Sequence, residues 1–215
     1  MPELKVRAQQ LRRPEGDLGI SMAEMMNKGN ELMCRNTYSR STIGKGHRIL
    51  EIGMGNGFFV PELFKMAEDL TYVGFDYSKL MVDKASELNT SYIASGRASF
   101  VHGSVDALPF ETNSFDRICT SNTLYFWPSP ADNMKALTNV LKPGGRILIA
   151  IRPKDIMLKM KVTQYDFTLY TLAETALLME SAGLNIINAE TIDEPDRTLG
   201  GETYELKSTY VLAEK

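Results

Sequence analysis

The residues with the clearest chemical potential lie in a glycine-rich segment, residues 47–60. A β-rich run there ends in the acidic Glu51 and is followed by Gly53, Gly55 and Gly57, after which helix-type residues begin. Glycines let the backbone turn sharply and let a ligand approach without a Cβ in the way. Amides at the start of a helix favour an electron-rich group. The segment therefore predicts a nucleotide-like ligand at the carboxyl end of the first strand.

The spacing of these glycines disfavours two common nucleotide loops. A dinucleotide loop of the form G-x-G-x-x-G needs its third glycine where this chain has Phe58, and no Gly-Lys-Ser or Gly-Lys-Thr follows for a Walker loop. The next strand ends in Asp76, about 20 residues after the loop, where a carboxylate can accept hydrogen bonds from two ribose hydroxyls. Ser78 is free to cap the following helix, so Asp76 is predicted to bind a ribose.

Short apolar runs alternate with helix-type segments from residue 47 onward. Helices are predicted after Ser78, with Met81, Ala85 and Leu88 inside, then from Pro130 to about Leu141, and from Thr168 to Ala182 with Gly183 as a left-handed cap. Alternation of this kind favours a parallel sheet that helices cover on both faces. The predicted strands are Ile49–Ile52, Tyr72–Phe75, Ser99–His102, Phe115–Cys119, Arg146–Ile151, Asn185–Thr191 and Tyr204–Ala213.

The last two predicted strands are expected to pair differently from the others. The residues between them, Ile192–Thr203, are rich in Asp, Glu, Pro and Gly and show no helical periodicity for a parallel crossover. An antiparallel hairpin is therefore expected. The predicted fold class is α/β: a doubly wound, Rossmann-like sheet of seven strands, mostly parallel, with an antiparallel C-terminal hairpin.

Composition narrows the classes of function. The chain has 215 residues, a formal net charge of -3, two cysteines without CxxC spacing and two isolated histidines. A nucleic-acid footprint is disfavoured, and no metal site is expected. No secretory signal and no apolar run of about 20 residues is present, so we expect no membrane span and a cytoplasmic location.

Three further motifs follow the loop and Asp76 in order: Leu108-Pro109-Phe110, Ser114-Phe115-Asp116, and the turn Lys142–Gly145 after Leu141. With these motifs, residues 46–151 resemble a class I S-adenosylmethionine (SAM)-dependent methyltransferase. The resemblance is strongest to the small-molecule branch, the methyltransferase type 11 domain that includes the ubiquinone and menaquinone biosynthesis enzymes. It implies a SAM-binding methyltransferase domain over residues 46–215, with S-adenosylhomocysteine as product and no metal.

The resemblance also implies which residues contact the cofactor. Gly53, Gly55 and Gly57 would hold its methionyl and ribose parts, and Glu51 would lie near the methionyl amine. Asp76 would bind the ribose hydroxyls, and Tyr77 or Leu80 would lie near the adenine.

Two later segments complete this set. Ser104 occupies the position where the family often has an Asp that binds the adenine amino group, and Val105 can contribute its backbone N–H; alternatively, Asp106 takes part. In the loop after the fourth strand, Asn122 and Leu124 are expected to touch the cofactor.

Methyl transfer from a sulfonium is an in-line displacement that mainly needs alignment of the reactants and exclusion of water. A general base is required only if the nucleophile carries a proton. Tyr125, expected to face the substrate, Asp106 and Tyr165 are candidates for catalysis. Residues 1–45 are expected to form an N-terminal helical lid whose methionines shape a pocket for a small, partly apolar acceptor. Pro153–Tyr170 is expected to form the opposite wall.

Other functions remain open at this point. A non-catalytic SAM- or S-adenosylhomocysteine-binding regulatory protein would keep the same cofactor site, and an NAD-dependent oxidoreductase is disfavoured by Phe58 and by the predicted hairpin. A methyltransferase of protein or RNA is a third alternative, and the lack of a basic patch or an added recognition domain disfavours RNA. The partner is expected to be a small molecule and the protein a monomer or homodimer; the acceptor, its reacting atom and the pathway are not determined by the sequence.

Overall fold

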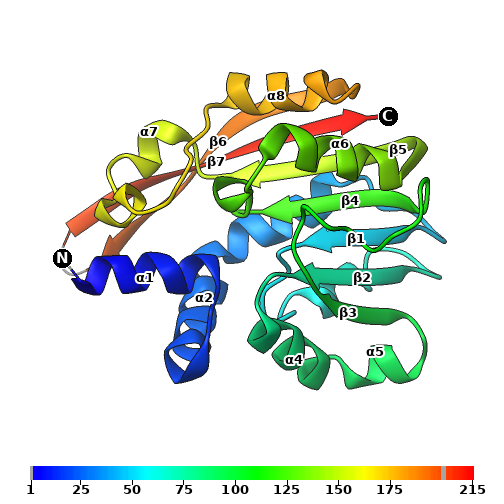
Figure 1. Ribbon diagram of the computed structural model, residues 1–215, viewed down its shortest axis with the longest axis horizontal. Helices are drawn as coiled ribbons and strands as arrows, with labels where there is room; N and C mark the ends of the chain where they lie inside the picture. The colour runs from blue at the N-terminus through cyan, green and yellow to red at the C-terminus, as the bar shows by residue number, and fades with distance from the viewer. Residues whose placement is uncertain (1, 200–201) are drawn as a thin grey trace.

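The architecture is a seven-stranded sheet with helices on both faces (Figure 1), seen in a computed structural model that describes residues 2–199 and 202–215. The strand order is β3-β2-β1-β4-β5-β7-β6, in which the first five strands pair in parallel and β7 runs antiparallel to β5 and β6. The predicted fold class is therefore confirmed. The strands are β1 (Arg48–Ile52), β2 (Thr71–Asp76), β3 (Ala98–His102), β4 (Phe115–Ser121), β5 (Leu141–Ile151), β6 (Asn185–Leu199) and β7 (Glu202–Glu214).

The helices frame the sheet and extend beyond its carboxyl edge. In Figure 1 the arrows of β1 and β4 point toward α1 and α2, which lie at that edge. None of the helices within the described residues is long and apolar enough to cross a bilayer. The helices are α1 (Pro2–Arg12), α2 (Gly16–Arg40), α3 (Val60–Leu63), α4 (Lys79–Leu88), α5 (Thr90–Ala94), α6 (Pro130–Val140), α7 (Lys154–Met157) and α8 (Leu172–Ser181), with 3-10 turns η1 (Leu124–Phe126) and η2 (Lys161–Gln164).

Two apolar clusters, one on each face, hold the sheet in place. Neighbouring residues of β1 enter different clusters: Leu50 packs with α6 and α8, whereas Ile49 packs with α2 and α3. This burial on both faces explains why the parallel strands read as continuous apolar runs instead of alternating with polar residues.

Local sequence signals place several helix ends. Ser78 caps α4 by accepting a hydrogen bond from the Met81 amide, and Gly183 adopts φ +85° after α8, both as predicted. Leu88 was expected on the inner face of α4 but is 58% exposed, so that assignment was wrong. α8 begins at Leu172 and not at Thr168, because Thr171 and Glu174 form a capping box that fixes its start.

Two predicted loops are strand in the structure. β5 already begins at Leu141, so Lys142–Gly145 belongs to the strand. The neighbouring strand β4 has a register shift between Phe115 and Arg117. Much of Ile192–Thr203 is also strand: β6 continues to Leu199, with a register shift between Glu194 and Arg197 that contains Pro195. Pairing in the long hairpin therefore overrides the loop-like composition, and the proline is tolerated at a bulge on an edge strand.

Candidate cofactor and acceptor site

A cavity of about 310 Å3 opens at the carboxyl ends of β1, β2 and β4, beneath the junction of α1 and α2. This is the edge where open α/β sheets bind ligands. We call it the cofactor cavity; the predicted site residues on its wall are Glu51, Gly53, Gly55, Asp76, Tyr77, Ser104, Val105, Asp106 and Asn122.

The glycine loop forms the floor of the cofactor cavity through left-handed backbone conformations. Gly53, Gly55 and Gly57 have φ values of +70°, +59° and +67°. A Cβ on Gly53 would lie 2.1 Å from the Thr123 side chain, whereas a Cβ on Gly55 would meet open space. Gly57 does not line the cavity; a Cβ there would approach Ala85 of α4 at 2.9 Å. Gly57 therefore serves to pack the loop against α4.

Asp76 joins the end of β2 to the glycine loop. Its Oδ2 accepts a hydrogen bond from the Gly55 amide at 2.9 Å, and its Oδ1 accepts one from the Ser78 amide at 2.8 Å. Burial raises the pKa of the carboxyl group to about 6. Each carboxylate oxygen can accept a further bond, so the group can receive two hydroxyls of a ribose.

Glu51 is a buried acid held by two tyrosines. Tyr38 of α2 and Tyr72 of β2 donate their hydroxyls to its Oε2 at 2.8 and 2.7 Å, and burial raises the pKa of the carboxyl group. Both bonds end on Oε2, which leaves Oε1 available to a cationic group in the cavity. A buried carboxylate is costly without such a partner, so the position suits the ammonium of a methionyl group.

The opposite end of the cavity has the residues expected around an adenine. Tyr77 is 43% exposed, and the Arg13 guanidinium lies 5.0 Å from its ring centroid. Ser104 and the buried Val105 face the same space, and Asp106 lies beside them at the surface. The structure thus brings all four residues to one end of the cavity, and their contacts with a cofactor stay a prediction.

The loop after β4 is connected to α2 and to the end of β5 by the polar groups of Asn122. Asn122, at φ +58°, accepts hydrogen bonds from the Tyr125 hydroxyl at 3.0 Å and the Arg152 amide at 3.3 Å, and donates one to Asn30 of α2 at 3.1 Å. Leu124 is fully buried in the core and does not line the cavity. The structure therefore gives Leu124 a packing role and places no cofactor contact there.

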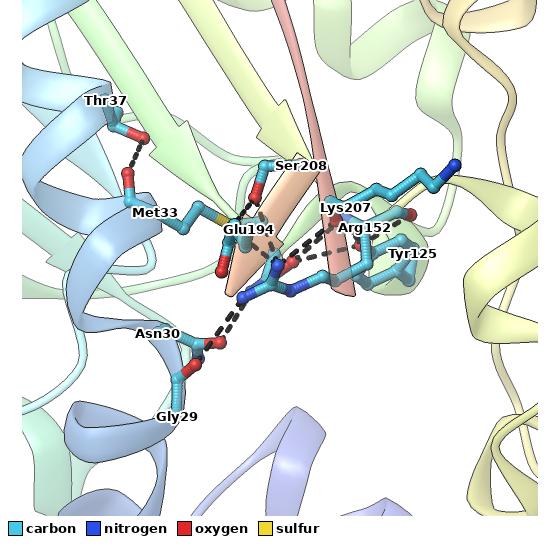
Figure 2. A network of polar contacts seen from close by, with 10 residues as sticks. Gly29, Asn30, Met33, Thr37, Tyr125, Arg152, Glu194, Lys207 and Ser208 are labelled. Atoms are coloured by element: carbon cyan, nitrogen blue, oxygen red, sulfur yellow. Dashed lines mark hydrogen bonds and ion pairs between the residues drawn. The ribbon is translucent and has the colours of Figure 1, made fainter. Parts of the chain in front are cut away.

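A buried ion pair anchors this loop to the C-terminal hairpin (Figure 2). Arg152 Nη1 lies 2.6 Å from Glu194 Oε1, and the two side chains are 6% and 3% exposed. Arg152 also donates to Ser208 Oγ and the Lys207 carbonyl, both at 3.1 Å, and to the Gly29 carbonyl of α2 at 3.5 Å. One side chain thus connects β5, the hairpin and α2.

Tyr125, Asp106 and Tyr165, the three candidates for catalysis, do not converge. The Tyr125 hydroxyl is occupied by Asn122 and by the backbone of Arg152, and burial raises its pKa further above the physiological range. Tyr165 lines neither the cofactor cavity nor the second cavity described below. Among the described residues of the cofactor cavity no histidine or lysine occurs. The geometry favours catalysis by positioning, and the three roles stay predictions.

A second cavity of about 270 Å3 adjoins the first. Its wall comes from the end of α1, from η1 and the residues after it, and from part of the predicted Pro153–Tyr170 wall. We call it the aromatic cavity, and its lining is Arg12, Tyr125, Phe126, Trp127, Pro128, Asp166, Phe167 and Thr168.

Sequence reasoning missed several residues of this site: Arg12, Tyr38, Tyr72, Arg152 and Glu194. Arg152 carried a usable signal, because a charged residue directly after the apolar run Arg146–Ile151 marks the carboxyl end of a strand. The others depend on contacts between distant segments and had no local signature.

Comparisons with known proteins agree with this site. Residues 50–149 match the family described as a methyltransferase domain. The chain is 24% identical to the uncharacterized methyltransferase YdaC of Bacillus subtilis over 131 residues, which are 61% of this chain and 70% of YdaC. It is 27% identical to the ubiquinone/menaquinone biosynthesis C-methyltransferase UbiE of Pseudomonas paraeruginosa over 157 residues, covering 70% of this chain and 60% of UbiE.

Among solved structures, a methyltransferase in complex with the Trm112 methyltransferase activator of Haloferax volcanii shares the fold. Its TM-score is 0.79 at 19% identity, with 99% of this chain and 97% of that chain covered. The matching domain and the methyltransferase relatives support SAM-dependent methyltransferase activity for this chain.

Proposed function

We propose that this methyltransferase transfers the methyl group of SAM to a small, partly apolar acceptor bound beneath the N-terminal helices. The observation that carries the proposal is the mixed lining of the cofactor cavity. Buried carboxylates and a glycine loop line it together with apolar side chains, including Met26, Phe126 and Trp127.

Bound SAM supplies an activated methyl group on a sulfonium. The chain's own residues bind and orient it: Glu51 pairs with the methionyl ammonium, Asp76 accepts from the ribose hydroxyls, and Tyr77, Ser104 and Val105 surround the adenine. Fixing both ends of the cofactor directs the methyl group toward the acceptor side, which lowers the barrier by proximity and orientation.

Residues 1–45 act as the lid in this proposal, and two sets of contacts hold the lid on the rest of the chain. The second half of α2 is fixed by Tyr38 on Glu51 and by Thr37 Oγ1, 2.9 Å from Ser121 Oγ. The junction between α1 and α2 is held by Ser78 Oγ, which donates to the Pro14 carbonyl at 2.6 Å. Since Ser78 lies two residues after Asp76, the lid closes directly over the ribose end and excludes water there.

The proposal includes no metal and no nucleic acid, and the cytoplasmic location expected from the sequence stays a prediction. We propose a monomer or homodimer. The Haloferax volcanii relative in fold was solved with a protein activator, so light scattering of the purified chain is needed to establish whether it stands alone.

The cofactor-binding part of the proposal is tested by calorimetry with SAM, S-adenosylhomocysteine and NADH, using the wild type and Asp76→Asn. We expect both SAM and its product to bind, and Asp76→Asn to weaken them about 100-fold, because two charge-assisted hydrogen bonds each contribute about 1.5 kcal/mol. Asp83→Asn, on the exposed face of α4, is the matched control and should bind normally. Binding of NADH alone would contradict the proposal.

A further inference from the structure

We propose that Tyr38 couples the N-terminal lid to the methionyl end of the cofactor: it positions the Glu51 carboxylate for the ammonium, so that seating of α2 and binding of the cofactor strengthen each other. Tyr38 is thereby a positioning residue that acts through Glu51. The inference rests on the proposed function, since the pairing of Glu51 with the ammonium belongs to it.

Two tyrosines from different elements hold the same carboxylate oxygen. Glu51 Oε2 accepts one hydroxyl from Tyr38 of α2 at 2.8 Å and one from Tyr72 of β2 at 2.7 Å, and all three side chains are buried. Tyr72 is fixed in the sheet, where the rings of Phe64 and Phe100 pack against it. Tyr38 lines the cofactor cavity and Tyr72 does not. The two donors are therefore alike in chemistry, and only Tyr38 belongs to the lid.

The two hydroxyls oppose the cost of burying this acid. Burial raises the pKa of Glu51, both hydroxyls lower it, and the charge of Asp76 on β2 raises it further. Two thiols also interact with its charge, Cys119 on β4 and Cys34 on α2, and burial raises the pKa of each, so they add no charge near neutral pH. The ionisation of Glu51 therefore depends on its two tyrosine donors, and loss of either one would raise its pKa.

Tyr38 is rigidly connected to the part of the lid that covers the cavity. α2 is one unbroken helix from Gly16 to Arg40. Residues three or four apart lie on one face of a helix. A row with this spacing lines the cofactor cavity and consists of Ala23, Met26, Asn30, Cys34 and Tyr38. A shift of the helix at Tyr38 therefore moves the whole row over the cavity.

The coupling works in both directions. The cofactor ammonium favours the ionised form of Glu51, and an ionised carboxylate accepts a stronger hydrogen bond from Tyr38 than a neutral acid does. Linkage then requires that α2, once seated through this bond, raises the affinity for the cofactor by the same factor. A ligand without the ammonium should bind without this gain.

The experiment removes one hydroxyl at a time from the full chain, with Tyr38→Phe as the test variant and Tyr72→Phe as the matched control. S-adenosylhomocysteine carries the ammonium, and methylthioadenosine shares its adenine and ribose but lacks the amino-acid end. Calorimetry gives the affinities, and thermal unfolding checks that the variants are folded. We expect Tyr38→Phe to weaken S-adenosylhomocysteine about tenfold, the effect of one hydrogen bond to a charged group, and to leave methylthioadenosine unchanged.

Hydrogen exchange of the α2 amides separates the two tyrosines. In the wild type, S-adenosylhomocysteine should slow exchange in α2 more than methylthioadenosine does, and this comparison needs no variant. S-adenosylhomocysteine should still slow it in Tyr72→Phe, whose missing donor belongs to the sheet, but not in Tyr38→Phe. Because either change raises the pKa of Glu51, the loss of affinity relative to the wild type should grow in both variants as the pH is lowered from about 8 to about 6.

The outcomes separate this inference from the proposed function. If Tyr38→Phe weakens both ligands alike, or neither, Tyr38 has only a structural role and the inference is overturned. It is also overturned if the two ligands slow exchange in wild-type α2 equally, or if the two variants show the same exchange. In each of these cases S-adenosylhomocysteine still binds the wild type, and the proposed function stands. If S-adenosylhomocysteine does not bind the wild type, the proposed function fails and the inference fails with it.

Discussion

The floor of the cofactor cavity and the aromatic cavity are built in different ways. The floor consists of strand ends and the turns that directly follow them, so Gly53, Gly55 and Asp76 are placed by the geometry of the parallel sheet. The aromatic cavity is assembled from α1, η1 and the segment 166–168, which are distant in sequence. The floor is encoded by local motifs, and the aromatic cavity depends on long-range contacts.

Arg152 is a long-range contact beside the aromatic cavity. Its guanidinium bonds to the hairpin and to α2, and its backbone bonds to Tyr125 and Asn122. The glycine loop is held more locally, since Asp76 reaches it through a hydrogen bond to Gly55. The two regions should therefore respond differently to mutation.

The largest effect is expected for Arg152→Met. It leaves the nearly fully buried Glu194 without its cation, and breaking a buried pair in this way costs about 3–5 kcal/mol. The free energy of unfolding, measured with urea, should fall by that amount. At low temperature, where the variant is still folded, binding of S-adenosylhomocysteine should be nearly unchanged because Arg152 does not line the cofactor cavity.

Replacing both partners separates the charge from the packing. Arg152→Met combined with Glu194→Leu should recover much of the lost stability, because no unpaired charge remains in the interior. A double variant as unstable as the single one would show that the hydrogen bonds to Lys207 and Gly29 carry the stability instead.

The same division explains what the sequence could predict. The glycine loop, Asp76, the Ser78 cap and the terminal hairpin follow from short-range patterns, and the structure contains all of them. Glu194 could not be found this way, because its partner Arg152 is far away in the chain and the surrounding Asp- and Glu-rich segment resembles a solvated loop.

Leu124 and Leu88 show the two limits of pattern reasoning. Leu124 lies in the loop where the cofactor was expected, but loop position alone does not give the direction of a side chain, and it packs into the core. Leu88 fits the helical period of α4 but is the last residue of that helix, and its side chain is exposed.

A smaller loss of stability, caused at the floor of the cofactor cavity, is expected for Gly53→Ala. A Cβ would lie 2.1 Å from the Thr123 side chain, on a backbone at φ +70° that disfavours any L side chain. Gly46→Ala is the matched control, since it has φ +74° but open space around the added Cβ. The control should lose about 1 kcal/mol of unfolding free energy from backbone strain alone, and Gly53→Ala about 2–3 kcal/mol.

Thermal unfolding of the two glycine variants provides the measurement, together with the affinity for S-adenosylhomocysteine. Only Gly53→Ala should lower that affinity, because Gly46 lies outside both cavities. Equal losses of stability in the two variants would mean that the glycine loop accommodates the added Cβ of Gly53→Ala without further cost, and that the loop is not rigid.

The smallest effect is the dependence of cofactor affinity on pH. Burial raises the pKa of Asp76 to about 6, and in the proposed function the ribose hydroxyls bind to its ionised form. The affinity for S-adenosylhomocysteine should therefore be constant above pH 6 and fall below it, by at most about tenfold per pH unit for one protonating group. The raised pKa of Glu51 acts in the same direction, because its ionised form pairs with the ammonium.

The stability of the unliganded protein should respond to Asp76 with the opposite sign. Its pKa is about 6 in the folded chain, above the ordinary value of 3.8 for an aspartate, so the folded state holds this proton more tightly. The resulting stabilisation is fully present below the lower pKa and is lost as the pH rises through about 6. Calorimetric affinity and urea unfolding over this range, with Asp76→Asn as the control that removes both dependences on this group, measure the two trends. If affinity and stability rose together with pH in the wild type, the pKa of Asp76 in the free folded protein would lie below its ordinary value, which would contradict the effect of burial described above.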